Sequence, residues 1–137
     1  VDIGTGTGVL AIALAMRTHQ PVLATDIDPV AVTTTAENAE DNGVGRLVLP
    51  LEATGLDHPQ IRAFGPYDLI VANILAAPLV ALSPGMRRIA AHGATIILSG
   101  ILNTQAARVI AAYGRQGIVL THKLVRKEWT TLILERR

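Results

Sequence analysis

The stretch that decides the fold is VDIGTGTGVLAIALA, residues 1–15. Asp2 stands inside a short apolar segment, and glycines follow at Gly4, Gly6 and Gly8 before an unbroken apolar run. A strand that turns through glycines into a helix presents bare backbone N–H groups and the positive end of the helix dipole. Without side chains, a ligand can approach that backbone closely. The stretch therefore predicts a ligand-binding strand–turn–helix unit of an open α/β sheet.

The glycine spacing distinguishes between two kinds of ligand. The dinucleotide fingerprint G-x-G-x-x-G requires a third glycine where this chain has Val9, which argues against a pyrophosphate clamp. Asp26 follows Gly8 by 18 residues, at the predicted end of the second strand. A carboxylate at that place accepts hydrogen bonds from the ribose hydroxyls of an adenosine cofactor. Asp28 has a simpler predicted role, as the N-cap of the next helix.

The rest of the chain alternates short β-branched segments with longer alanine-rich ones, which is typical of a parallel, helix-covered sheet. Only three polar residues separate the last two strands, so these should form an antiparallel hairpin. The predicted class is α/β, a mostly parallel seven-stranded sheet with helices on both faces and a C-terminal antiparallel hairpin. The predicted strands are 1–3, 21–27, 46–51, 67–72, 95–99, 117–125 and 129–135. The predicted helices are 9–17, 29–41, 78–91 and 104–115. The first is apolar almost all round and is expected to be buried, and the third is expected to be broken at Pro84 and ended by Gly93. Residues 52–65 are predicted to form a loop with one helical turn.

The composition excludes several classes of function. A length of 137 residues fits one domain, 1–137, and the chain starts inside a strand without methionine, so we expect an N-terminally truncated domain. A net charge of +1 and four scattered aromatic residues speak against nucleic-acid binding. There is no cysteine for thiol chemistry or zinc-thiolate sites, and no segment is apolar enough to predict a membrane span. The four histidines fall at predicted loops or element ends, so none is a convincing general base.

Further segments narrow the identification. They are TDIDPVAV at 25–32, YDLIVANILAAPL at 67–79, LSGIL at 98–102 and EWTTLILE at 128–135. With Asp2, the glycines and Asp26, the sequence resembles the class I methyltransferases that use S-adenosyl-L-methionine and have a Rossmann-like fold. The ANILA and LSGIL segments together make it similar to the catalytic domain of the ribosomal protein L eleven methyltransferase family. That family methylates amino groups of a large-subunit ribosomal protein.

The resemblance implies a cofactor, a set of contacts and a reaction. The cofactor is S-adenosyl-L-methionine, and in-line transfer of its methyl group to a deprotonated amine needs no metal. Gly4 would lie against the methionine part, Asp26 would hold the ribose, and Asp2 would order the glycine loop or receive the cofactor ammonium through water. Asn73 would face the methionine moiety and the methyl-transfer centre, as the catalytic residue. The full set of implied cofactor contacts is Asp2, Gly4, Thr5, Gly6, Gly8, Asp26, Ile27 and Asn73.

Two departures from the family pattern leave alternatives open. Asn73 is followed by Ile74 rather than by the proline pair and aromatic residue of many amine methyltransferases, so no aromatic ring stacks on the target. The adenine contact falls to Glu52 or to Thr54. The expected partner is a ribosomal protein in the cytoplasm, with no nucleic acid and no membrane. The alternatives are another protein or small-molecule amine as acceptor, a dinucleotide-dependent oxidoreductase, and a non-catalytic fragment.

Overall fold

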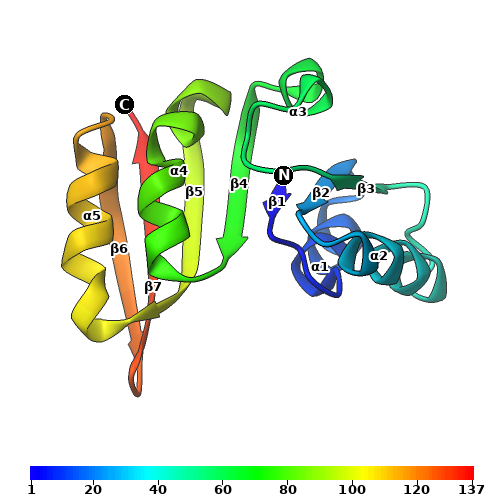
Figure 1. Ribbon diagram of the computed structural model, residues 1–137, viewed down its shortest axis with the longest axis horizontal. Helices are drawn as coiled ribbons and strands as arrows, with labels where there is room; N and C mark the ends of the chain where they lie inside the picture. The colour runs from blue at the N-terminus through cyan, green and yellow to red at the C-terminus, as the bar shows by residue number, and fades with distance from the viewer. The chain divides into compact units, whose positions relative to one another are not determined.

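A computed structural model describes all 137 residues, Val1–Arg137. The chain divides into two compact parts, Val1–His58 and Pro59–Arg137, whose elements are labelled in Figure 1. Each part is described by itself below. None of the helices has the length and apolar character needed to cross a membrane.

The first part holds three parallel strands and two helices. Strand β2 pairs with β1 on one side, where Asp2 lies opposite Ala24, and with β3 on the other, where Asp26 lies opposite Glu52. Both helices pack against β2 and β3. The elements are β1 (Asp2–Ile3), α1 (Val9–Thr18), β2 (Val22–Asp26), α2 (Pro29–Asp41) and β3 (Val48–Glu52).

The two helices of this part lie where they were predicted, but α1 is less buried than expected. Helix α2 begins as expected, because the Asp28 carboxylate accepts a hydrogen bond of 2.8 Å from the Val30 N–H and Pro29 occupies the first turn. The expectation that α1 is a buried helix is wrong, because only Ala11, Ile12 and Ala15 are buried. Val9 is 67% and Met16 52% exposed. An apolar residue at nearly every position hides which face packs on the sheet.

The second part contains a mixed sheet in the order β4-β5-β7-β6. Strands β4 and β5 are parallel, whereas β7 is antiparallel to both of its neighbours, so the predicted C-terminal hairpin is confirmed. Helices α4 and α5 pack on each other and on this sheet (Figure 1). The elements are α3 (Pro59–Phe64), β4 (Tyr67–Asn73), α4 (Ala76–Ile89), β5 (Ala90–Leu102), the 3-10 turn η1 (Asn103–Gln105), α5 (Ala106–Gly114), β6 (Ile118–Arg126) and β7 (Trp129–Arg136).

Helix α4 is continuous, so the predicted break at Pro84 is wrong. A proline inside a helix leaves the carbonyl four residues earlier without its N–H donor. Here that carbonyl belongs to Val80, and the Ser83 hydroxyl donates a hydrogen bond of 2.9 Å to it. The helix also ends before Gly93, at Ile89, because Ala90 already belongs to β5. The predicted strand 95–99 is the middle of this longer strand.

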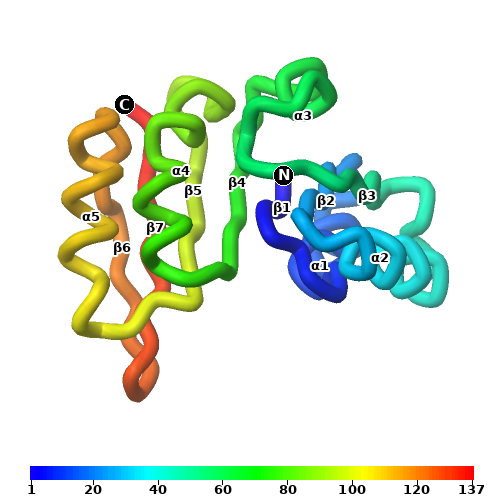
Figure 2. Tube along the Cα trace, in the orientation of Figure 1, coloured from blue at the N-terminus to red at the C-terminus, as the bar shows by residue number.

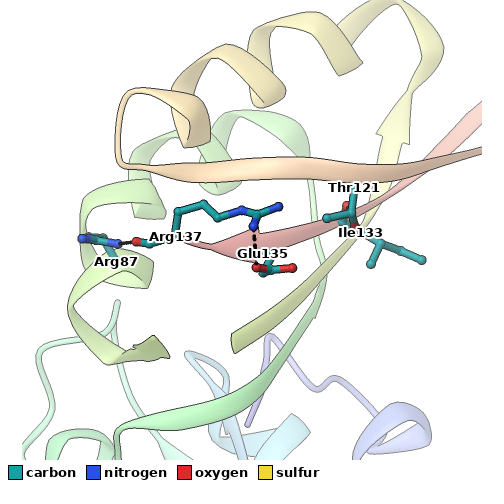
Figure 3. A network of polar contacts seen from close by, with 5 residues as sticks. All are labelled: Arg87, Thr121, Ile133, Glu135 and Arg137. Carbon is teal, nitrogen blue, oxygen red and sulfur yellow. Dashed lines mark hydrogen bonds and ion pairs between the residues drawn. The ribbon is translucent and has the colours of Figure 1, made fainter. Parts of the chain in front are cut away.

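The C-terminal end of the chain is held by a hydrogen bond from α4, and β7 is paired with β6. Arg87 of α4 donates a hydrogen bond of 2.7 Å to the Arg137 carbonyl, and the Arg137 guanidinium pairs with Glu135 at 3.2 Å (Figure 3). In Figure 2 the two strands of the hairpin, orange and red, run side by side to the turn that joins them. On one face of this sheet the core is fully buried around Ile96, Leu98 and Leu132.

Candidate functional site

The glycine loop and the end of β2 are held together by hydrogen bonds. The N–H groups of Gly4 and Thr5 donate to the Thr25 carbonyl at 2.8 and 2.9 Å. The Gly6 N–H donates to Asp26 Oδ2 at 2.9 Å. The glycine loop and the carboxylate that is predicted to bind a ribose therefore lie at the same end of the paired strands β1 and β2.

Asp26 keeps acceptor capacity after making these contacts. Its Oδ2 accepts from Gly6 and its Oδ1 accepts from the Asp28 N–H at 3.0 Å. Each carboxylate oxygen has two acceptor sites, so one on each oxygen remains for the hydroxyls of a ligand. Ile27 directly follows Asp26 in the sequence, and its apolar side chain is 68% exposed.

Asp2 is a buried carboxylate with one oxygen unpaired. The residue is 1% exposed, and its Oδ2 accepts hydrogen bonds from the Thr5 hydroxyl at 2.7 Å and the Ala11 N–H at 3.2 Å. Its Oδ1 has no hydrogen-bond partner. Burial raises the pKa of Asp2, and the hydrogen bonds from Thr5 and Ala11 oppose that rise. A buried anionic oxygen without a donor is unfavourable, and a cation or donor supplied by a ligand would relieve it.

The glycines of the loop serve different purposes. Gly6 has φ +60°, and a Cβ added there would meet nothing within 4 Å, so the backbone is bare on an open side. Gly8 has φ +87°, and its Cβ would lie 2.9 Å from Thr35 Cγ2. Gly6 thus leaves room for a ligand, whereas a side chain at Gly8 would strike α2.

Two residues of α2 hold the loop and were missed from the sequence. The Thr35 hydroxyl donates to the Gly6 carbonyl at 3.1 Å, and the Asn38 amide donates to the Thr7 carbonyl at 2.8 Å. Both bonds fix carbonyls of the loop and so restrict the direction of its N–H groups. The available signal was two polar residues three apart, which share one face of a helix.

The candidates for the adenine contact differ in their surroundings. Glu52 is the last residue of β3 and the register partner of Asp26. Thr54 lies beyond the strand, and both side chains are exposed. Glu52 is therefore the one of the two that the sheet brings beside a predicted ribose-binding carboxylate.

Asn73 belongs to the second part of the chain, as the last residue of β4. Its side chain is exposed. A carboxamide in this state has both its oxygen and its NH2 group available to a ligand. His19, His92 and His122 are exposed and His58 is half-buried. No group of three or more histidines and carboxylates is arranged to hold a metal ion.

Relatives match nearly the whole chain. The chain is 50% identical over 135 residues to the ribosomal protein L11 methyltransferase of Brucella suis, covering 98% of this chain and 47% of that protein. It is 52% identical over 136 residues to the protein of the same name from Rhodopseudomonas palustris, covering 99% of this chain and 46% of that protein. The chain therefore spans about half the length of the curated relatives it matches.

A solved structure supports the same grouping. The ribosomal protein L11 methylase of Lactobacillus delbrueckii subsp. bulgaricus superposes with a TM-score of 0.91 at 33% identity, covering 99% of this chain and 68% of that one. This similarity confirms the predicted Rossmann-like methyltransferase fold. The family described as ribosomal protein L11 methyltransferase (PrmA) matches residues 1–137. The chain therefore belongs to the ribosomal protein L11 methyltransferase family.

Proposed function

We propose that the protein containing this chain is a cytoplasmic, S-adenosyl-L-methionine-dependent N-methyltransferase that acts on amino groups of ribosomal protein L11. Family membership over the whole chain supports the substrate class. The observation that carries the cofactor assignment is the pairing of the glycine loop with Asp26, through the Gly6 N–H.

The residues of the first part fit S-adenosyl-L-methionine, a ligand with an ammonium group and a ribose diol. The unpaired Oδ1 of Asp2 suits the ammonium, either directly or through a water molecule. The free acceptor sites of Asp26 suit the two ribose hydroxyls. The open side of Gly6 suits close approach of the ligand to the backbone. Gly4, Thr5, Gly8 and Ile27 complete the proposed contacts, with Glu52 or Thr54 at the adenine.

The residues of the second part suit a neutral amine as the nucleophile. When bound, S-adenosyl-L-methionine supplies an electrophilic methyl group on a sulfonium, so the remaining task of the protein is to position the acceptor. An ammonium has no free lone pair, and an α-amine with a pKa near 8 loses its proton more readily than a lysine near 10.4. The Asn73 side-chain oxygen and a nearby backbone carbonyl accept the N–H bonds of the amine and direct its lone pair. Asn73 is therefore the proposed catalytic residue.

The experiment that tests this function uses the full-length protein. Purified protein is incubated with S-adenosyl-L-methionine and either ribosomal protein L11 or a panel of free amines, and methyl incorporation is followed by mass spectrometry. Methylation of L11 supports the proposal. Methylation of another amine, but not of L11, supports the alternative that the enzyme acts on another protein or on a small-molecule amine. Tight binding of a nicotinamide dinucleotide, with no binding of S-adenosylhomocysteine, would overturn the cofactor assignment.

The organisation of the domain stays a prediction. We propose that residues 1–137 form a single cofactor-binding domain and that the chain alone binds the cofactor more weakly than the full-length protein. Calorimetry with S-adenosylhomocysteine on both proteins tests this. Equal affinity would contradict it.

A further inference from the structure

Gly100, in the LSGIL segment, is one of two glycines of β5 that have a positive φ. The register between β5 and β7 shifts between Leu98 and Ile101, so Gly100 sits in a bulge. Its φ is +78°, in the left-handed region that favours glycine. The bulge also includes Ser99, which pairs in register with Asn73 of β4.

Two oxygens of the β4 end lie against Gly100. A Cβ added at this position would be 2.7 Å from the Ile74 carbonyl oxygen and 3.0 Å from Asn73 Oδ1. The first contact is with backbone, so the chain itself would have to move to admit a methyl group. The absence of a side chain at Gly100 is therefore what allows these two oxygens to occupy their present positions.

A hydrogen bond fixes the bulge that carries Gly100. The Ser99 and Thr131 hydroxyls lie 3.0 Å apart, with either able to donate, and join β5 to β7 within the bulge. Both side chains are half-buried. The surface on which Asn73 and Ile74 rest is thus supported from the neighbouring strand.

An amine acceptor with two N–H bonds requires two oxygens at a defined separation if its lone pair is to point in one direction. We propose that Gly100 is a positioning residue for the methyl acceptor, because it holds the Asn73 side-chain oxygen and the Ile74 carbonyl oxygen as a pair that receives the two N–H bonds of the amine. This proposal rests on the proposed function, in which a backbone carbonyl near Asn73 accepts from the amine, and what it adds is the role of Gly100 in placing the two oxygens. Gly100 acts through this pair and does not itself bind the amine.

The test compares two alanine substitutions in the full-length protein. Gly93 also has a positive φ, +77°, but a Cβ there would meet nothing within 4 Å, so Gly93→Ala introduces the backbone strain without the collision. For Gly100→Ala we expect kcat on ribosomal protein L11 to fall by about tenfold or more. The Kd for S-adenosylhomocysteine should stay within about twofold of the wild type, a change of less than about 0.5 kcal/mol. For Gly93→Ala, both the kcat on ribosomal protein L11 and the Kd for S-adenosylhomocysteine should stay within about twofold of the wild type.

Combining substitutions separates positioning from general damage. If Gly100 acts through the oxygen pair, Gly100→Ala should lower kcat far less in an Asn73→Ala background than in the wild type. Equal losses in both backgrounds, or a wild-type kcat for Gly100→Ala, would overturn the inference. Gly100→Asn is the second variant, since asparagine tolerates this φ better than alanine. If neither variant folds with cofactor bound, Gly100 is structural and the inference fails. Absence of L11 methylation by the wild-type protein would instead overturn the proposed function.

Discussion

The Gly6 amide donates a 2.9 Å hydrogen bond to the carboxylate of Asp26, joining residues 20 apart in the sequence. The bond fixes the loop to the end of β2 through the protein's own groups. Because Asp26 also accepts from the Asp28 N–H, its carboxylate is held at both oxygens. A ligand that contacts both the loop and this carboxylate meets groups already in place, which lowers the entropy lost on binding.

Replacing Asp26 by alanine should abolish measurable cofactor binding. Two hydrogen bonds to a charged group contribute about 1.5–3 kcal/mol each, so the Kd for S-adenosylhomocysteine should rise by at least about a hundredfold. Asp28→Ala is the matched control, since it removes a carboxylate two residues away whose role is to cap α2. It should lower the free energy of unfolding by about 1 kcal/mol. Calorimetry and thermal unfolding measure the two quantities, and unchanged affinity in Asp26→Ala would contradict the assignment.

Replacing Thr35 by valine should weaken cofactor binding, although Thr35 is not one of the proposed cofactor contacts. Valine keeps the branched shape against Gly8 but leaves the Gly6 carbonyl without its donor. We expect a loss of about 1–3 kcal/mol in the free energy of unfolding, because Thr35 is fully buried. The Kd should rise by several-fold as the loop loosens.

Thr33→Val provides the control for that experiment. Thr33 lies in the same helix and its hydroxyl also donates to a carbonyl, that of Pro29, but it is exposed. Its replacement should change stability by less than about 0.5 kcal/mol and leave the Kd unaltered. If both valine variants bind the cofactor equally well, the α2 contact does not position the loop.

Much of this molecule follows from local patterns in the sequence. The turn through the glycines and the Asp28-Pro29 helix start occur as predicted. The C-terminal hairpin is also confirmed, with a turn one residue shorter than predicted because Arg126 pairs with Trp129. The position of Asp26 at the end of β2, beside the glycine loop, could also be predicted, whereas its contact with a ribose stays a prediction. These features depend on residues close in sequence or on parallel strands ending at one edge.

The errors arose where a side chain far along the chain, or one hydrogen bond, decided the outcome. Nothing local to Pro84 reveals that the Ser83 hydroxyl satisfies the Val80 carbonyl. In a helix with as many apolar residues as α1, the sequence does not show which face will pack on the sheet. The close contact that a side chain at Gly100 would make involves Ile74, which is adjacent only after β4 and β5 have paired.

The pH dependence of stability should reveal the buried carboxylate of Asp2. Burial raises its pKa above the ordinary value of about 3.9, so the folded protein holds this proton to higher pH than the unfolded chain does. The resulting stabilisation is complete below the unfolded pKa and is lost as the pH rises through the folded pKa. The side chain at position 2 of the variant Asp2→Asn cannot ionise, so the variant does not lose stability in this way as the pH rises. Without cofactor, its free energy of unfolding relative to the wild type should increase as the pH rises through that range.

Two controls accompany the Asp2 experiment. Glu37→Gln removes an exposed carboxylate of α2 and should show a much smaller pH-dependent difference. With cofactor present, Asp2→Asn should bind S-adenosylhomocysteine more weakly, because the anionic oxygen proposed to face the ammonium is gone. A stability difference between wild type and Asp2→Asn that is flat across the acid range would show that this carboxylate is not desolvated.

The proline in α4 makes Ser83 more important than an ordinary helical serine. In the wild type, Ser83→Ala leaves the Val80 carbonyl without a donor and should lower the free energy of unfolding by about 1 kcal/mol. Pro84→Ala restores a backbone N–H that can donate to the same carbonyl. In that background Ser83→Ala should have almost no effect, giving a coupling free energy of about 1 kcal/mol in a double-mutant cycle measured by urea unfolding. Additive losses would mean that the hydroxyl does not substitute for the missing amide, and the continuity of α4 across Pro84 would then need another cause.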